Sequence, residues 1–505
     1  MSNILGIAGA SRNAALALCS AGRVVGVCEQ ERVSRTRRAA LPHGRLPREA
    51  LDTILNLGAC AEGDISTYAV AEAAIQLPPE HHVEHLDHHY AHAAAAFYSS
   101  AFTDAEILIC DRHRFPELTV WRADETGIRQ EDFTWFGPGF ATVYSQTAEA
   151  FGFRGNGDEH RLEALARVGA CRCGSAAPAF AYRGDHLEIP PTFQAAIASV
   201  VGRNGSTASV EERAGLANDL QQQLGGLLLQ VVADIKRRFG GRNLCLGGGL
   251  FYNSYFVTLI AESGVFDRVF VPPNPGNAGV AVGASCAVAA SGSRLVRDGA
   301  LSPFLGPEFG PGEIKATLDN CKLSYDYLRN GQLLDRTTHA LATGKLVGWF
   351  QGRMEWGSRA LGHRSILASP VAPYVLENLN VFLKQREPYR TYSVSVCLED
   401  LPRYFKGPAA SPMMEYEYEV VDRDLLARLL PLRATRLRVQ TVDAAAGLFY
   451  QLIRAFGDLT GVPMLVNTSF NGFNEPIVCN PRDAVRVFYG TGLDMAVLGN
   501  LVLVK

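Results

Sequence analysis

The sequence lacks the features that mark a membrane protein, a disulfide-stabilised secreted protein or a polyanion-binding protein. No apolar run reaches the roughly 20 residues that a membrane-spanning helix needs. The 48 Lys and Arg residues nearly balance the 51 Asp and Glu residues, so no overall field favours nucleic acid. The 11 cysteines show no zinc-ribbon or thioredoxin spacing, which predicts reduced thiols. Together these absences predict a cytoplasmic protein with no membrane and no nucleic acid as partner.

The composition is that of a large globular protein. With 505 residues, the chain exceeds the roughly 250–300 residues that one hydrophobic core can serve, so two domains are expected. Strand-like segments alternate with turns and helical segments, without a detectable internal repeat. This alternation predicts an α/β architecture with ligands at the carboxyl ends of strands. A Gly- and Pro-rich stretch over residues 292–313 predicts the boundary between the domains.

Histidines are concentrated in one short segment. Six of the 12 histidines lie between positions 81 and 92. A helix that starts at Asp87 would place His88 and His92 on one face, where two imidazoles can bind one metal ion. Asp111, after the apolar segment "ILIC", is the expected third ligand. Imidazole favours iron, zinc, copper or nickel over magnesium or calcium. The alternative interpretation is a helix start with capping and solvated histidines.

Two glycine-containing turns each follow an expected strand and precede an expected helix. They are "LGGGLFYNS", residues 246–254, and "PPNPGNAG", residues 272–279. Backbone amides in such turns can approach a phosphate or a nucleoside closely at the start of a helix. One turn alone is weak evidence, but the pair predicts a nucleotide site of the actin and sugar-kinase kind.

The second half of the chain contains a dense set of cations. Residues 350–370 and 383–390 include Arg353, Arg359, Arg364, Lys384, Arg386 and Arg390. Arg binds planar oxyanions through two donors, and Lys supplies a compact charge. On a chain without net positive charge, this set predicts a polyphosphate pocket, with a solvated basic face as the alternative. Glu355 and Glu387 are expected to orient the guanidiniums or to help hold Mg²⁺. The segment "VNTSFNG", residues 466–472, adds amides and hydroxyls suited to a phosphate or a carbonyl.

Taken together, these segments resemble the NodU/CmcH family of O-carbamoyltransferases. The hallmarks of that family occur here, in family order, as "HHYAH", "GGGLFYN", "GRMEWGSRALGHRS", "KQRE" and "NTSFN". The resemblance implies an α/β protein of two domains. Residues 1–310 would form a TsaD-like domain with an actin/hsp70-type ATPase fold, and residues 311–505 a YrdC-like domain. The second domain would make carbamoyl adenylate from ATP and carbamoyl phosphate, and the first would transfer the carbamoyl group to an acceptor hydroxyl.

The resemblance also implies roles for residues of the second domain. The phosphates of ATP and carbamoyl phosphate are expected at Arg353, Arg359, Arg364, Lys384 and Arg386. The adenylate or carbamoyl group is expected at Asn467, Thr468, Ser469 and Asn471, with Arg390 and Arg438 also at the cofactor site. ATP and Mg²⁺ are the cofactors implied for this half of the reaction.

In the first domain, the resemblance implies a nucleotide site and a metal site. The nucleotide is expected at Gly247, Gly248, Gly249, Asn253 and Asn277. His88, His92 and Asp111 match the family's metal ligands, where Fe²⁺ is expected. Asn277 stands where the family usually has an Asp ligand, and Asn offers only a neutral carbonyl oxygen. Arg112 follows Asp111 where the family favours Gly. Asp158 or Glu159 is expected to deprotonate the acceptor or to shape its pocket.

The acceptor itself cannot be identified from these motifs. The family carbamoylates antibiotics, nodulation oligosaccharides and other specialised metabolites, so a small hydroxylated metabolite is expected as partner. The oligomeric state is open, and a homodimer is one of the states considered. One alternative function is a tRNA-modifying threonylcarbamoyl enzyme, which shares both folds. The other is a non-catalytic, nucleotide-binding regulatory protein, for which Asn277 and Arg112 leave room.

Overall fold

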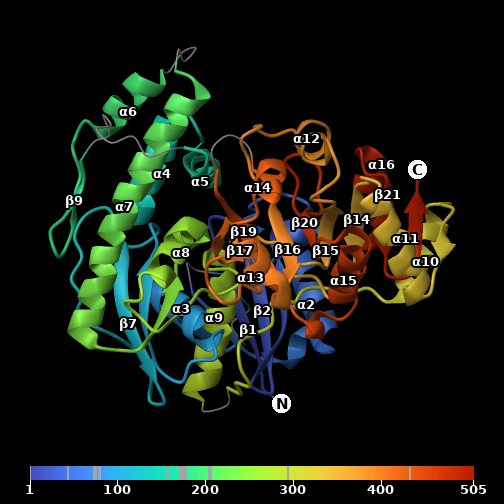
Figure 1. Cartoon of the computed structure of the whole chain (residues 1–505). Helices are drawn as coiled ribbons and strands as arrows, with labels where there is room; N and C mark the ends of the chain where they lie inside the picture. The colour runs from blue at the N-terminus through green and yellow to red at the C-terminus, as the bar shows by residue number, and fades with distance from the viewer. Residues whose placement is uncertain are drawn as a thin grey trace.

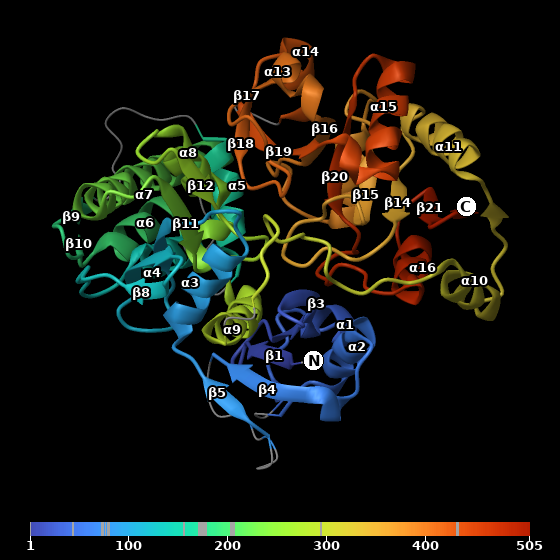
Figure 2. The same ribbon diagram turned by 90° about the horizontal axis from the view of Figure 1, so that it is seen from below.

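Three large β-sheets and the helices around them form the molecule (Figure 1). The computed structural model describes residues 2–42, 45–71, 75, 77, 81–154, 157–169, 179–202, 208–292, 295–430 and 434–505. Viewed from below, the units built on the three sheets lie around a common centre (Figure 2). None of the helices in the described ranges is long and apolar enough to cross a lipid bilayer.

The first two sheets have five strands each and share one topology. The order in the first is β3-β2-β1-β4-β5, with bounds β1 Asn3–Ala8, β2 Ala15–Ser20, β3 Arg23–Glu29, β4 Ile65–Val70 and β5 Val83–His85. The order in the second is β8-β7-β6-β11-β12, with bounds β6 Ala105–Cys110, β7 Leu118–Asp124, β8 Gly127–Gln130, β11 Asn243–Gly247 and β12 Arg268–Phe270. In each sheet three consecutive strands pair antiparallel and the last two pair parallel. This duplication confirms the actin/hsp70-type ATPase fold expected for the first part of the chain.

Two helices of small residues join these two sheets. Helix α3 (His88–Tyr98) packs on β6 and β11, and α9 (Asn277–Ser291) packs on β1 and β2, while the two helices also pack against each other. A Cβ at Gly283 would lie 1.9 Å from the carbonyl oxygen of Ala91. Only glycine permits so close an approach of the two backbones, so α9 depends on its small residues.

The other helices of the first part surround the two sheets. They are α1 Gln30–Ser34, α2 Arg48–Gly58, α4 Phe140–Ala150, α5 Glu159–Arg167, α6 Phe193–Val201, α7 Val210–Phe239 and α8 Ser254–Glu262, together with the 3₁₀ helix η3 Gly249–Tyr252. A two-stranded sheet pairs β9 (Ala181–Tyr182) with β10 (Leu187–Glu188). We refer to residues up to the end of α9 as the first part.

The second part, residues 311–505, is built on one ten-stranded sheet. Its order is β13-β22-β21-β14-β15-β20-β16-β19-β18-β17. The strand bounds are β13 Asp326–Tyr327, β14 Val347–Phe350, β15 Arg364–Ala368, β16 Ser393–Cys397, β17 Phe405–Lys406, β18 Glu417–Val420, β19 Arg436–Val442, β20 Met464–Ser469, β21 Met495–Leu498 and β22 Leu501–Val504. The helices are α10 Pro311–Asn320, α11 Asn330–Ala342, α12 Val375–Asn378, α13 Leu401–Tyr404, α14 Arg423–Leu429, α15 Leu448–Thr460 and α16 Pro481–Gly490, with a π-helical turn at Leu379–Lys384. The α/β class expected for this part is confirmed.

Two local predictions from the sequence are also confirmed, namely the helix that starts at Asp87 and the strand that precedes Asp111. Asp87 caps α3, because its side chain accepts a hydrogen bond from the Tyr90 amide at 2.9 Å. The apolar segment "ILIC" lies within β6, so Asp111 follows the end of a buried strand. The basic segment after β3 begins as a helix, since α1 covers Gln30–Ser34 and ends at Arg35 with φ +59°.

Candidate functional site

A large cavity lies where the three sheets meet. Its volume is about 890 Å³, and its walls come from loops, helices and strands of all three sheet units. Twelve Arg and Lys side chains line it against eight carboxylates, so the wall carries an excess of positive charge. These cations are Arg12, Arg32, Arg37, Arg38, Arg112, Arg161, Arg167, Arg359, Lys384, Arg386, Arg390 and Arg438. Such a wall suits a ligand with several negative charges.

Three polar atoms on the cavity wall are buried and have no hydrogen-bond partner among the described residues. They are Nη2 of Arg386, Nε of Arg438 and Oδ1 of Asn467. Buried polar groups are almost always paired in folded proteins. Two guanidinium donors and one amide acceptor are therefore left for a bound molecule.

The cationic side chains are held by specific neighbours. Nη2 of Arg359 donates to the Tyr252 carbonyl oxygen at 2.7 Å, and Nε of Arg386 donates to Oδ1 of Asn380 at 2.8 Å. The guanidinium of Arg386 also lies over the Tyr392 ring, 3.9 Å from its centroid. Burial, followed by the repulsion of the nearby Arg386 guanidinium, lowers the pKa of Arg390 to about 10. An anion bound here would relieve this mutual repulsion.

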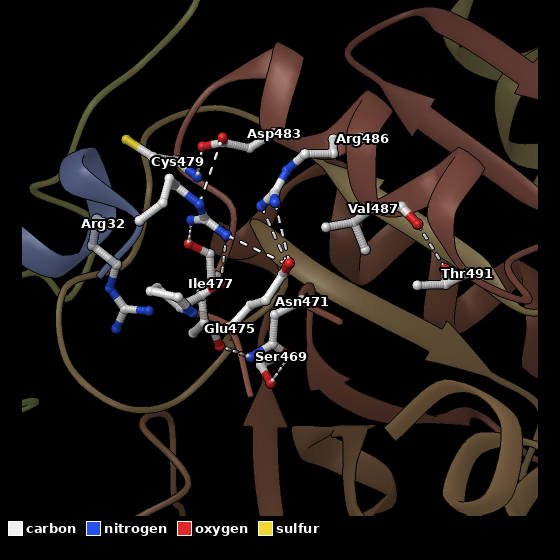
Figure 3. Close-up of polar contacts among 12 residues, drawn as sticks. Arg32, Ser469, Asn471, Glu475, Ile477, Cys479, Asp483, Arg486, Val487 and Thr491 are labelled. Atoms are coloured by element: carbon white, nitrogen blue, oxygen red, sulfur yellow. Dashed lines mark hydrogen bonds and ion pairs between the residues drawn. The ribbon is translucent and has the colours of Figure 1, made fainter. Parts of the chain in front are cut away.

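The end of β20 and the segment that follows it form a second wall of the cavity. Nδ2 of Asn467 donates to Oγ of Ser395 at 3.0 Å, which fixes the amide so that its oxygen faces away from that contact. Ser469 Oγ donates to Asn471 Oδ1 at 2.8 Å, and Asn471 Nδ2 donates to the Glu475 carbonyl oxygen at 2.6 Å (Figure 3). Thr468 also lines the cavity. The four residues predicted here, Asn467, Thr468, Ser469 and Asn471, are thus brought together.

Lys384 reaches the same segment, and its ammonium group donates hydrogen bonds to oxygen atoms of the protein. Its Nζ lies 2.6 Å from the Ser469 carbonyl oxygen, and 3.0 and 2.6 Å from the carbonyl oxygen and Oδ1 of Asn471. Burial and the neighbouring Arg386 lower the pKa of Lys384 well below its usual value. Three oxygen acceptors nevertheless require three N–H donors, so this geometry retains the charged ammonium.

Two of the predicted phosphate-binding arginines lie outside the cavity. Arg353 donates to the carbonyl oxygens of Val25 and Leu305, both at 2.8 Å. Arg364 is fully buried, donates to the Gln351 carbonyl oxygen at 2.7 Å, and stacks on Phe350 with 3.6 Å to the ring centroid. The structure therefore does not place these two on the expected phosphate pocket. Their guanidiniums satisfy backbone carbonyls instead.

The predicted metal ligands lie together, and Asp111 alone of the three lines the cavity. Nε2 of His88 is 3.6 Å from Oδ1 of Asp111, and Nε2 of His92 is 3.8 Å from Oδ2. One ligand atom from each residue lies within 4.8 Å of the others, and all three side chains are buried. Nε2 of His92 is buried without a hydrogen-bond partner in the described part of the chain. Burial, followed by the effect of His88, lowers the pKa of His92, so its imidazole is neutral and can act as a ligand. Two imidazoles and a carboxylate fit a transition-metal ion.

The triple-glycine turn fits tightly against this cluster. Gly248 has φ +99°, and a Cβ there would lie 2.1 Å from the Cys110 carbonyl oxygen. The amide of Gly249 donates to Oδ2 of Asp111 at 3.3 Å. Of the residues expected to hold a nucleotide, Gly249 and Asn253 line the cavity, while Gly247, Gly248 and Asn277 do not. Asn253 caps α8 by accepting from the Tyr255 amide at 3.0 Å.

The two candidate bases lie at the start of α5, and both line the cavity. A carboxylate oxygen of Asp158 lies 3.4 Å from Nη2 of Arg38, and the other lies 3.6 Å from Nη1 of Arg161. Glu159 accepts a hydrogen bond from Oγ of Ser145. Asp158 is therefore paired with cations, whereas Glu159 has a neutral donor. The expected metal helper Glu355, by contrast, does not line the cavity.

Sequence reasoning missed the contribution of the first part to the cationic wall. Arg37 and Arg38 follow α1 and line the cavity. Arg161, Glu163 and Arg167 on α5 also line it. The available signal was the density of arginines in residues 32–38, but nothing local indicated which of them point inward.

Comparison with known proteins shows the family to which the chain is related. Residues 44–286 match the family described as carbamoyltransferase N-terminus, and residues 338–505 match the family described as carbamoyltransferase C-terminus. The chain belongs to the carbamoyltransferase family. This assignment confirms the expected resemblance and makes the protein a transferase enzyme.

Relatives of this carbamoyltransferase cover most of its length. The uncharacterized protein sll1178 of Synechocystis is 30% identical over 90% of this chain and 80% of its own. The nodulation protein NolNO of Sinorhizobium fredii is 27% identical over 96% of this chain and 78% of its own. Among solved structures, the activator of 2-hydroxyisocaproyl-CoA dehydratase from Clostridium difficile matches 59% of this chain and 99% of its own. That match has a TM-score of 0.39 and 15% identity.

Proposed function

We propose that this carbamoyltransferase is ATP-dependent and acts in two steps. The second part, with a boundary near residue 310, makes carbamoyl adenylate from ATP and carbamoyl phosphate. The first part then transfers the carbamoyl group to a hydroxyl of a small specialised metabolite. The observation that carries this proposal is the set of unpartnered buried groups on a cationic cavity wall, at Arg386, Arg438 and Asn467.

The adenylating step requires two anions to meet. ATP and carbamoyl phosphate repel each other, so neutralisation by preorganised cations lowers the barrier to their reaction. Arg359, Arg386, Arg390 and Arg438 supply this charge from the second part. Formation of the mixed anhydride releases pyrophosphate from ATP and inorganic phosphate from carbamoyl phosphate, with consumption of one water. The Asn467 amide oxygen is available to accept from the carbamoyl NH₂ group.

The transfer step requires a base and protection from water. Glu159 lines the cavity, and the hydrogen bond that it accepts comes from a neutral group, the hydroxyl of Ser145. Of the two carboxylates it is therefore the better candidate for removing the proton from the hydroxyl that receives the carbamoyl group. Asp158 shapes the pocket through Arg38. A shared cavity keeps the hydrolysable adenylate from bulk water between the steps.

The first part also has a set of groups that would hold a metal ion. His88, His92 and Asp111 would bind it, and iron is the ion proposed for this donor set. When bound, such an ion would supply Lewis-acid polarisation of an oxygen atom. Mg²⁺ is proposed to accompany ATP.

The test is exchange of labelled pyrophosphate into ATP. The proposal predicts exchange that requires carbamoyl phosphate and needs no acceptor. A panel of hydroxylated metabolites then serves to find the acceptor, with mass spectrometry to detect the carbamoylated product. Absence of carbamoyl-phosphate-dependent exchange from folded, metal-replete protein would refute the first step. Exchange without any carbamoylated product from the panel, but with a carbamoylated tRNA, would refute the proposed acceptor class.

A further inference from the structure

Helix α5 of the first part carries a buried ionic network that reaches the second part. Its centre is the guanidinium of Arg167, whose Nη2 lies 2.7 Å from Oε1 of Glu163 on the same helix. The same nitrogen lies 2.5 Å from Oε1 of Glu417 on β18, and Nη1 donates to Oγ1 of Thr391 at 3.1 Å. Glu163, Arg167 and Glu417 are each almost completely buried. The network therefore fixes α5 against the second part.

A serine of the first part links both carboxylates. Oγ of Ser254, at the start of α8, lies 2.7 Å from Oε1 of Glu163 and 2.9 Å from Oε1 of Glu417. The Ser254 amide also donates to Glu163 at 3.3 Å. Glu163 thus cannot move without breaking several hydrogen bonds, so its position is set by α5 and α8 together.

Glu163 faces two of the cations proposed to bind the phosphates. Its Oε1 lies 3.6 Å from Nη1 of Arg438 on β19. Burial alone would raise the pKa of Glu163, but Arg167, Arg438 and Arg359 together lower it to about 2. Glu163 is therefore a carboxylate at neutral pH. Arg438 has no other ion-pair partner among the described residues, and its Nε is one of the two unpartnered guanidinium donors on the cavity wall.

We propose that Glu163, a residue of the first part, is a positioning residue that aims the guanidinium of Arg438 at the anion bound by the second part. The inference rests on the proposed function, because it takes that anion to be a phosphate of the adenylating step. Glu163 holds one edge of the guanidinium through Nη1, which leaves Nε directed to the ligand. The first part also holds Arg359 of the second part, because the Tyr252 carbonyl oxygen accepts a hydrogen bond from its guanidinium.

Positioning by Glu163 and a simple effect of its charge would change anion binding in opposite directions. Removal of a negative charge close to an anion site strengthens anion binding if charge alone matters. If Glu163 acts by orienting Arg438, its removal weakens binding, because the guanidinium loses its fixed direction and its hydrogen-bond geometry. The sign of the change therefore separates positioning from a mere charge effect.

The experiment measures pyrophosphate binding by calorimetry to the full-length protein. We compare wild type, Glu163→Gln, Arg438→Gln and the double variant. We expect Glu163→Gln to weaken pyrophosphate binding about 10-fold, the loss typical of one misplaced hydrogen bond to a charged group. In the Arg438→Gln background, Glu163→Gln should add less than about 2-fold, because the group that it positions is already gone.

Controls separate positioning from damage to the fold. Glu106→Gln replaces another buried carboxylate, on β6 and outside the cavity, and should leave pyrophosphate binding unchanged. Binding stoichiometry and thermal midpoint report the folded fraction of each variant. If Glu163→Gln does not fold, Glu163→Asp replaces it. That variant retains the charge but withdraws the carboxylate from Arg438, and we expect the same weakening.

The outcomes distinguish this inference from the function on which it rests. Unchanged or tighter pyrophosphate binding by folded Glu163→Gln would overturn the inference and leave the proposed function standing. Equal losses from Glu163→Gln in the wild-type and Arg438→Gln backgrounds would also overturn it. Failure of the wild type to bind pyrophosphate at all would overturn both.

Discussion

The ammonium nitrogen of Lys384 lies 2.6 Å from Oδ1 of Asn471, in the segment that follows β20. Together with the carbonyl oxygens of Ser469 and Asn471, this contact occupies all three ammonium protons. The ammonium group of Lys384 therefore binds oxygen atoms of the protein itself. It holds the segment whose amides and hydroxyls line the cavity, and its charge adds to the field there.

Replacement of Lys384 should consequently loosen that segment. Lys384→Met is expected to lower carbamoyl-phosphate-dependent pyrophosphate exchange by about 100-fold, the scale seen when a preorganised donor is lost. Amide hydrogen exchange at residues 469–471 should become faster at the same time. Lys384→Arg retains the charge but not the three short contacts, so it should not restore activity. Full activity in Lys384→Arg would show that charge alone suffices.

Arg359 and Arg364 belong to one motif but should respond differently to mutation. Arg359→Ala should lower pyrophosphate exchange at least about 100-fold with little loss of stability, because Arg359 lines the cavity. Arg364→Ala should instead destabilise the fold by about 3 kcal/mol or more, since it removes a fully buried side chain that donates to the Gln351 carbonyl oxygen and stacks on Phe350. Urea unfolding and exchange assays check both. Normal exchange in folded Arg359→Ala would remove that residue from the site.

Only some of the histidines between positions 81 and 92 should bind the metal ion. Protein loaded with Fe²⁺ under anaerobic conditions should lose its bound iron on replacement of His92 by Ala, because one of three ligand atoms is removed. The matched control is His82→Ala, which removes an exposed imidazole from the same segment and should keep the iron. Elemental analysis after gel filtration measures the content. Equal iron in both variants would contradict the assignment.

The pKa of Glu163 predicts a pH dependence of stability. Its folded value of about 2 lies below the usual 4.5, so its contribution is present above about pH 4.5 and is lost as the pH falls toward 2. The difference in unfolding free energy between wild type and Glu163→Gln should be constant from pH 7 to about pH 5 and then shrink. Urea unfolding at a series of pH values measures it. A difference that persists unchanged at pH 3 would contradict the ionised, cation-paired state.

The glycine turn beside Asp111 should be intolerant of a side chain. Gly248→Ala combines a left-handed φ with a Cβ 2.1 Å from the Cys110 carbonyl oxygen, so we expect a loss of about 2 kcal/mol or more. Gly226→Ala, on the exposed face of α7 with open space around it, should raise stability by about 0.5–1 kcal/mol. Thermal unfolding compares the two. Equal stability of both variants would show that the turn relaxes freely.

Much of the site could be predicted because its signals are local. A capping Asp87 and a four-residue spacing place His88 and His92 on one helical face in any fold that keeps the helix. Glycines after β11 predict a turn whatever surrounds it. The duplication of the two five-stranded sheets had no such signal, because topology depends on which strands pair and not on sequence identity between the halves.

Local patterns in the amino-acid sequence were enough to predict the α/β class, the family hallmarks, the cluster of His88, His92 and Asp111, and the richness in cations of residues 350–390. Which of these cations face the cavity depends on how the chain folds. Arg353 and Arg364 turn to backbone carbonyls, while Arg38 and Arg167 of the first part join the wall. The long arginine side chain can turn in several directions, and it takes the one in which its guanidinium finds hydrogen-bond acceptors. Those acceptors come from segments distant in sequence, which only folding brings together.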